Sequence, residues 1–184
     1  MGIEPGDERY LPPDRPPRRA GQEPSARLTL DAYIRLRKDL ERLETDGRTH
    51  MAERLLHARE LGDISENAEY ESAKHEQALM EGRIRELQQK LKDPDIVEVA
   101  EGGDSAEPGM LVTVRPLDDG EPEDEIYLLA HSAEERSSAA RTVTVESPFG
   151  SALSGSRVGD RVSYQAPGGT FSYQVVAIEP HRPT

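Results

Sequence analysis

Two acidic residues three positions apart, Asp63 and Glu66, stand in a short polar link between two long stretches of helical periodicity. Carboxylate oxygens are ligands that Mg²⁺ prefers, and this ion is commonly held by one or two protein carboxylates plus water and substrate phosphates. A link between two helices has no walls that would exclude water or clamp a substrate. The pair therefore suits delivery of charge or a metal ion into a site on another molecule, as in a two-metal hydrolysis of a phosphodiester.

The same spacing also has a purely structural interpretation. Asp63 followed by Glu66 is a capping box, in which each side chain accepts a hydrogen bond from the backbone amide of the other at the start of a helix. Both charges would also lie at the positive end of the helix dipole. Spacing alone favours capping, so the metal interpretation needs support from the rest of the chain.

Apolar residues at heptad spacing flank this link on both sides. The spacing changes near Gly47, where we expect local unwinding or a bend over residues 45–49. Two stripes joined by a short link can bury each other only if the chain folds back on itself, which predicts an antiparallel helical hairpin. The stripes comprise Tyr33, Leu36, Leu40, Leu43, Met51, Leu55 and Ala58 before the link, and Tyr70, Ala73, Gln77, Met80, Ile84, Leu87 and Leu91 after it.

The helical period ends at Asp93, because the following Pro94 disfavours helix in the residue before it. Short alternating runs then predict the strands of a small antiparallel sheet, with a short helix or turn over residues 151–158. The fold class is therefore α+β, with a coiled-coil hairpin over residues 27–95 and a globular domain over 96–184. The predicted strands span residues 111–115, 125–129, 141–146, 161–165 and 171–178.

Residues 1–26 are rich in proline and arginine and have few aliphatic side chains. Such a segment buries too little apolar area to offset the entropy of ordering, so we expect a disordered leader. It also lacks the apolar stretch of a signal peptide.

Composition excludes several classes of protein. The 184-residue chain has no cysteine, so it has neither a disulfide framework nor a thiolate metal site. No apolar run approaches the ~20 residues that span a bilayer, and we expect a cytoplasmic protein without a membrane partner. The net charge is −13, and residues 94–184 hold 6 basic against 16 acidic residues. Strong binding to naked nucleic acid is therefore not expected, and a protein with a basic or mixed surface is the better partner.

Residues 59–70, which read R-E-L-G-D-I-S-E-N-A-E-Y, resemble the tip of the bacterial Gre-family transcript cleavage factors. The likeness continues through residues 73–77, 81–84 and 147–153 and covers about residues 28–180. Ile64 stands where the family usually has leucine, and His75 stands where glutamate is common. Neither departure removes the acidic pair.

The resemblance implies a concrete function. Gre factors insert a coiled coil through the secondary channel of RNA polymerase and stimulate the polymerase's own hydrolysis of backtracked RNA, so the factor itself is not an enzyme. Asp63 and Glu66 match the family's acidic pair, which would help to recruit a second Mg²⁺ only in the complex with polymerase. The implied partners are bacterial RNA polymerase and the nascent RNA 3′ end, and the implied C-terminal domain is FKBP-like. A hairpin that pairs with itself favours a monomer.

The resemblance also assigns roles to residues around the tip. Arg59 and Lys74 would contact RNA phosphates, although a solvated helix face explains both equally well. Gly62 and Asn67 would shape the tip, and Tyr70 matches a tip position that core packing explains better. Ser147 and Pro148 would dock on the polymerase.

Two other functions stay open. A Gre-family paralogue could occupy the channel and inhibit transcription without cleavage, although retention of Asp63 and Glu66 favours cleavage. A chaperone or prolyl isomerase is the alternative of a different class, because an FKBP-like domain is implied. Isomerase pockets are lined by aromatic residues, and this chain offers few of them and no tryptophan.

Overall fold

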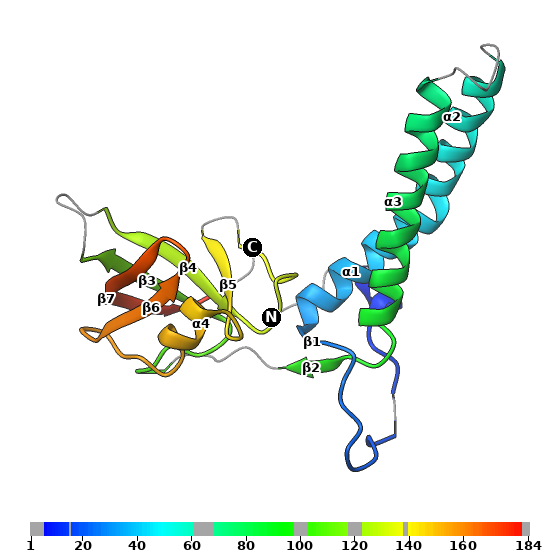
Figure 1. Ribbon diagram of the computed structural model, residues 1–184. Helices are drawn as coiled ribbons and strands as arrows, with labels where there is room; N and C mark the ends of the chain where they lie inside the picture. The colour runs from blue at the N-terminus through cyan, green and yellow to red at the C-terminus, as the bar shows by residue number, and fades with distance from the viewer. Residues whose placement is uncertain are drawn as a thin grey trace. The chain divides into compact units, whose positions relative to one another are not determined.

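A computed structural model describes residues 6–14, 16–60, 68–97, 103–117, 123–137 and 140–181 (Figure 1). The chain divides into two compact units. We call them the helical unit, residues 1–26 and 33–95, and the sheet unit, residues 27–32 and 96–184. The predicted α+β class, with a helical hairpin preceding a small sheet domain, is confirmed.

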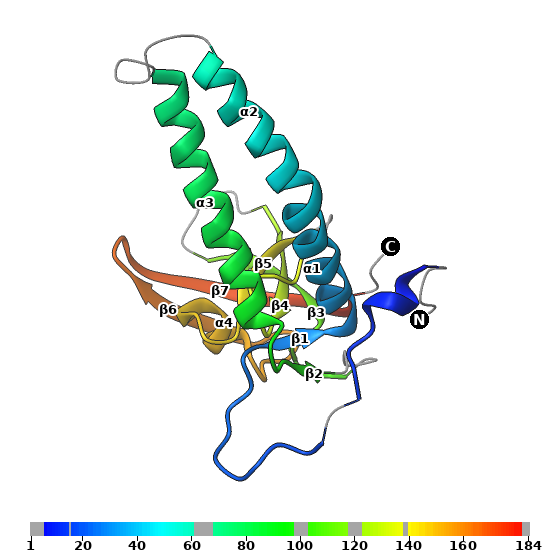
Figure 2. The ribbon, with the colours of Figure 1, turned by 90° about the vertical axis from the view of Figure 1, so that its right-hand side faces the viewer.

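The hairpin is built from three α-helices, with α1 and α2 in one arm and α3 in the other. Figures 1 and 2 both show α2 and α3 side by side. Two ion pairs show that the arms are antiparallel: Arg48 pairs with Glu81, and Arg54, further along α2, pairs with Glu76, which comes earlier in α3. The elements are α1 (Leu30–Arg42), α2 (Arg48–Glu60) and α3 (Ala68–Lys90).

A π-helical turn, Leu43–Gly47, joins α1 to α2. The backbone N–H of Arg48 donates to the carbonyl of Leu43, five residues earlier. The step from Leu43 to Met51 is eight residues, one more than a heptad. The wider π-helical turn accommodates the additional residue, so that the apolar stripe faces the other arm again. The predicted local unwinding is therefore confirmed.

The seam between the arms is apolar, as the two stripes predict. Residues of both stripes are buried, and the remaining stripe positions are half-buried. The glycine at position 47 lets the arms approach, because a Cβ atom there would lie 3.1 Å from the sulfur of Met80. Buried stripe residues are Tyr33, Leu36, Leu40, Met51, Ala58, Ala73, Ile84, Leu87 and Leu91.

The described part of the leader differs from the predicted disorder. A 3₁₀ helix, η1 (Asp7–Tyr10), buries the Tyr10 ring, which is only 8% exposed. The Tyr10 hydroxyl donates to the Glu41 carboxylate on α1, and Asp7 forms an ion pair of 2.5 Å with Lys38 on the same helix.

A second group of leader contacts lies at the end of α3. Arg18 donates to the Asp93 carboxylate at 3.0 Å and to the Pro94 carbonyl at 2.6 Å, and Ser25 donates to the Lys90 carbonyl at 2.8 Å. The leader is thus anchored by one aromatic ring and by hydrogen bonds to the end of a helix, in place of aliphatic residues. Composition does not reveal such contacts.

The sheet unit contains a five-stranded sheet with the order β5-β4-β3-β7-β6. All neighbouring strands are antiparallel except β4 and β5, which are parallel. The predicted wholly antiparallel sheet is therefore wrong in this one pairing. A hairpin turn cannot join parallel strands, and residues 131–140 make the longer connection. The strands are β3 (Met110–Pro116), β4 (Glu125–Ala130), β5 (Arg141–Thr144), β6 (Arg161–Ala166) and β7 (Gly169–Pro180).

Two short strands, β1 (Arg27–Thr29) and β2 (Asp95–Val97), form a separate two-stranded sheet. They flank the hairpin in the sequence, and we did not predict them, because three residues are too few to show an alternating pattern.

The core of the sheet unit lies between the sheet and helix α4 (Pro148–Leu153), which contacts β6 (Figure 1). Phe149 is its centre, with ring centroids of Tyr127, Tyr164 and Tyr173 at 5.0, 4.8 and 5.0 Å. A short helix or turn was predicted over residues 151–158, and the observed helix begins three residues earlier, at Pro148, and ends at Leu153. Aliphatic residues that complete this core are Val112, Val114, Leu129, Leu153, Val162 and Val175.

Candidate functional site

The predicted acidic pair belongs to the link between α2 and α3. Asp63 and Glu66, together with the predicted tip residues Gly62 and Asn67, lie outside the described residues. The described arms end at Glu60 and resume at Ala68. The structure therefore describes the two helix ends on either side of the link.

Arg59 and Tyr70 meet across the arms at these helix ends. A guanidinium nitrogen of Arg59 donates to the Tyr70 hydroxyl at 3.4 Å, and its central carbon lies 5.6 Å from the Tyr70 ring centroid. This is cation–π geometry. The two residues were predicted separately, one as a phosphate contact and the other as a packing residue, and the structure brings them together.

Lys74 lies one helical turn beyond Tyr70 on α3 and is exposed. Its ammonium donates to the side-chain oxygen of Gln77 at 3.4 Å, a contact within its own helix. Its role as a phosphate contact stays a prediction.

Two arginine–glutamate pairs hold the arms in register below the Arg59–Tyr70 contact. Arg48 makes two hydrogen bonds to Glu81, at 2.8 and 2.9 Å, and Arg54 also contacts both carboxylate oxygens of Glu76. The hydrogen bond from each guanidinium holds the pKa of its glutamate below the ordinary value. Paired guanidinium and carboxylate groups resist sliding of one arm along the other, because a shift of one residue breaks both bonds in each pair.

Sequence reasoning missed these pairs, although the hairpin carries a signal for them. In an antiparallel pair of helices, positions equally far from the link face each other. Arg48 and Glu81, Arg54 and Glu76, and Arg59 and Tyr70 all lie about equally far on either side of residues 64–65. Matching charges about that midpoint would have found the first two.

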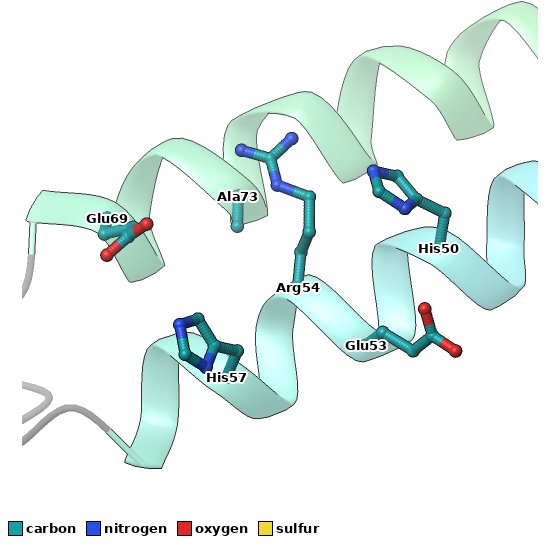
Figure 3. Close-up of a pocket in the computed structure, with 6 residues that line it drawn as sticks. All are labelled: His50, Glu53, Arg54, His57, Glu69 and Ala73. Carbon is teal, nitrogen blue, oxygen red and sulfur yellow. The ribbon is translucent and has the colours of Figure 1, made fainter.

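A hollow of about 240 Å³ lies on this part of the hairpin. Figure 3 shows Arg54 and His57 of α2 reaching toward α3, where Ala73 and Glu69 lie. Its lining also includes His50 and Glu53. Among the described residues, no group of three or more histidine, aspartate or glutamate side chains could hold a metal ion. The hollow is therefore not assigned as a metal centre.

Ser147 and Pro148 form the start of α4. The Ser147 hydroxyl accepts a hydrogen bond from the Gly150 amide at 3.1 Å and donates to the Thr144 carbonyl at 2.7 Å. Pro148 occupies the first turn, where its missing N–H costs nothing. Both residues therefore have a local structural role, and their docking on polymerase stays a prediction.

Within the described residues, none of the helices is long and apolar enough to cross a membrane.

Comparison with known families covers both units. The profile described as "Transcription elongation factor, N-terminal" matches residues 26–96, and the one described as "Transcription elongation factor, GreA/GreB, C-term" matches residues 101–180. These spans leave most of the leader outside the family.

Individual relatives agree with the family profiles. The chain is 42% identical to transcription elongation factor GreA of Thermotoga neapolitana over 152 residues, which is 83% of this chain and 96% of that protein. It is 44% identical to GreA of Roseiflexus sp. (strain RS-1) over 156 residues, or 84% and 97%. Among solved structures, GreA factor homolog 1 of Thermus thermophilus is 30% identical over 84% of this chain and 98% of that one, with a TM-score of 0.38. The resemblance noted in the sequence is confirmed, and the chain belongs to the GreA/GreB family of transcription elongation factors.

Proposed function

We propose that this elongation factor inserts its hairpin through the secondary channel of bacterial RNA polymerase and stimulates the polymerase's own cleavage of backtracked RNA. The observation that carries the proposal is the antiparallel hairpin whose link bears Asp63 and Glu66. Membership of the elongation factor family supports it, and so does the match of residues 59–70 to the family's tip motif.

The hairpin acts as a carrier for the two carboxylates. At 1.5 Å per residue, the 23 residues of α3 hold the tip roughly 35 Å from the base of the hairpin. The ion pairs of Arg48 and Arg54 keep the arms in register over that length. The carboxylates can thus reach a recessed site without a pocket of their own, so the factor acts through the catalytic centre of the polymerase.

The donor set suits Mg²⁺, because Asp63 and Glu66 offer the carboxylate oxygens that this ion prefers. When bound, Mg²⁺ lowers the pKa of its water and stabilises the leaving oxygen. Two carboxylates bind it weakly by themselves, and the polymerase and RNA would supply the remaining ligands. The factor's share of the reaction is to place two negative charges beside the polymerase active centre and to orient the attacking water.

The proposal is tested with purified factor and backtracked elongation complexes of bacterial RNA polymerase. We expect Asp63→Asn and Glu66→Gln to lower the RNA cleavage rate about 10- to 100-fold or more, because each removes one ligand charge. Binding to polymerase should be retained. Glu71→Gln is the matched control, since Glu71 is an exposed carboxylate on the adjoining turn of α3.

Two results would contradict the proposal. Blocked RNA synthesis without shortened transcripts would identify an inhibitory paralogue. Parallel loss of helicity, binding and cleavage in both variants would mean that the two acids only cap α3. The prolyl isomerase alternative finds no support in the sheet unit, where Phe149, Tyr127, Tyr164 and Tyr173 pack against one another.

A further inference from the structure

Arg59 and Tyr70 contact each other across the arms at the helix ends that flank the link. We propose that this pair, the latch, positions the acidic tip by fixing the separation of the arms where the tip begins. The inference rests on the proposed cleavage function and assigns Arg59 a role through Tyr70 rather than through RNA. Both are positioning residues, since neither is required to touch the reacting atoms.

The described end of the hairpin has little apolar core of its own. The buried stripe residues nearest to the link are Ala58 and Ala73, each 1% exposed. Alanines let the arms approach closely but bury little area, and burial stabilises in proportion to area. The large buried residue Ile84 lies three turns further down α3. Closure of the last turns therefore depends on contacts other than hydrophobic burial.

Polar contacts are widely spaced along the described arms. The next polar cross-arm contact below the latch is the Arg54–Glu76 pair, about 7–9 Å along the helix axes. Between them lie only the small side chains of Ala58 and Ala73 among the buried stripe residues. Without the latch, the polar contacts that fix the arms would therefore end one to two helical turns further from the start of the tip.

Loosening of the arms at this point would change the orientation of the residues that they carry. Misplacement of a catalytic group by about 1 Å can cost on the order of 10²-fold in rate. We therefore expect loss of the latch to lower cleavage at least threefold at saturating factor. Affinity for polymerase should change little, because the Arg48 and Arg54 pairs keep the rest of the hairpin intact.

The competing explanation is that Arg59 contacts an RNA phosphate directly. Arg59→Ala lowers cleavage under both explanations, so the partner residue decides between them. A phosphate contact does not need the Tyr70 ring, whereas the latch does. Arg59→Lys adds a second distinction, because lysine keeps the positive charge for a phosphate but loses the planar guanidinium that lies over the ring.

A double-mutant cycle tests the latch in the full-length factor on backtracked complexes. We expect Arg59→Ala and Tyr70→Leu each to lower the maximal cleavage rate at least threefold, and the double variant to be no slower than the slower single variant. Tyr70→Phe should stay close to wild type, because the ring remains and the lost hydrogen bond is a long one of 3.4 Å. Arg85→Ala is the control, since Arg85 is an exposed arginine of α3 about four turns from Tyr70.

Hydrogen exchange of the free factor separates failure of the latch from failure of the cleavage proposal. In the latch variants, backbone amides at the ends of α2 and α3 should exchange faster than in the wild type. Exchange near Arg48 and Glu81 should be unchanged. Multiplicative effects in the double variant, a Tyr70→Leu variant with wild-type cleavage, or unchanged exchange would each overturn the latch. If the variants exchange faster but the wild-type factor stimulates no RNA cleavage, the Arg59–Tyr70 latch is supported and only the proposed function is refuted.

Discussion

Gly150 in α4 offers a sharp test of the fold, because the local and tertiary expectations have opposite signs. Helix propensity alone predicts that Gly150→Ala stabilises α4 by up to about 1 kcal/mol. A Cβ atom at this position, however, would lie 2.0 Å from the carbonyl oxygen of Thr144 and 2.7 Å from its carbonyl carbon. These are backbone atoms, so no side-chain rotation can relieve the contact.

The magnitude follows from the shift that is needed. Even the shortest distance that real Cβ contacts reach, 3.0 Å, requires α4 and the end of β5 to separate by about 1 Å. The same Thr144 oxygen accepts hydrogen bonds from the Ser147 hydroxyl at 2.7 Å and the Ser147 amide at 3.0 Å, and such a separation breaks both. Overpacking costs about 1–3 kcal/mol and each lost bond about 1 kcal/mol. After the gain in propensity, we expect a net loss of roughly 2–4 kcal/mol.

Thermal unfolding of Gly150→Ala measures this loss. For a unit of about 90 residues, a loss of that size lowers Tm by roughly 10–25 °C. Near-ultraviolet circular dichroism follows the sheet unit, because three of its tyrosines surround Phe149. Gly82→Ala in α3 is the matched control, since its Cβ would meet nothing closer than a nitrogen of Arg85 at 4.0 Å. An unchanged or raised Tm for Gly150→Ala would refute the reasoning.

Two further predictions concern ionisation and the leader. Burial, followed by the Glu125 carboxylate, raises the pKa of Tyr127 to about 12, whereas an unfolded tyrosine ionises near pH 10. The stability this group contributes is therefore complete below pH 10 and is lost as pH rises through about 12. In Tyr127→Phe, the free energy of unfolding should therefore decrease less between about pH 10 and 12 than in the wild type. A titration of tyrosinate absorbance in which all tyrosines ionise near pH 10 would contradict the raised pKa of Tyr127. In the leader, Arg18→Ala should speed proteolysis of residues 10–25, because it removes the hydrogen bonds from Arg18 to Asp93 and Pro94. Arg19→Ala, at the exposed neighbouring position, should not. Equal proteolysis rates for the two variants would show that Arg18 does not hold the leader.

The hairpin was predictable because its signal is local and periodic. An apolar stripe repeated over several turns defines both helices, and the eight-residue step from Leu43 to Met51 even indicates the π-helical turn. The start of α4 was also readable. Ser147 followed by Pro148 is a helix N-terminus signal, but the predicted helix began later because the alternating pattern of β5 was extended to Glu146.

Other features depend on contacts that no local pattern contains. Alternation indicates that residues 141–144 form a strand but not which neighbour it pairs with, so the parallel pairing of β4 and β5 was missed. The order of the leader depends on single residues, Tyr10 and Arg18, that meet partners far along the chain. Composition averages over such residues, and this is why it indicated disorder.

The candidate site shows the same division. The motif identified the family from adjacent residues, and the role that it assigns to the acidic pair stays a prediction. It did not indicate that Arg59 and Tyr70 face each other, because that follows only from the register of the folded arms. Because each residue was considered separately, Arg59 was predicted to contact an RNA phosphate and Tyr70 to pack in the core, and their contact with each other was not predicted.

The change of chemistry along the hairpin explains why a tyrosine is suited to the last cross-arm contact. The two lower contacts pair arginine with glutamate, which holds register through two hydrogen bonds each. A glutamate at position 70 could close the arms in the same way, but it would add another carboxylate beside a link that already carries Asp63 and Glu66. Like charges close together disfavour each other's ionised state. The neutral ring of Tyr70 holds the Arg59 guanidinium across the arms without adding a further negative charge next to the link.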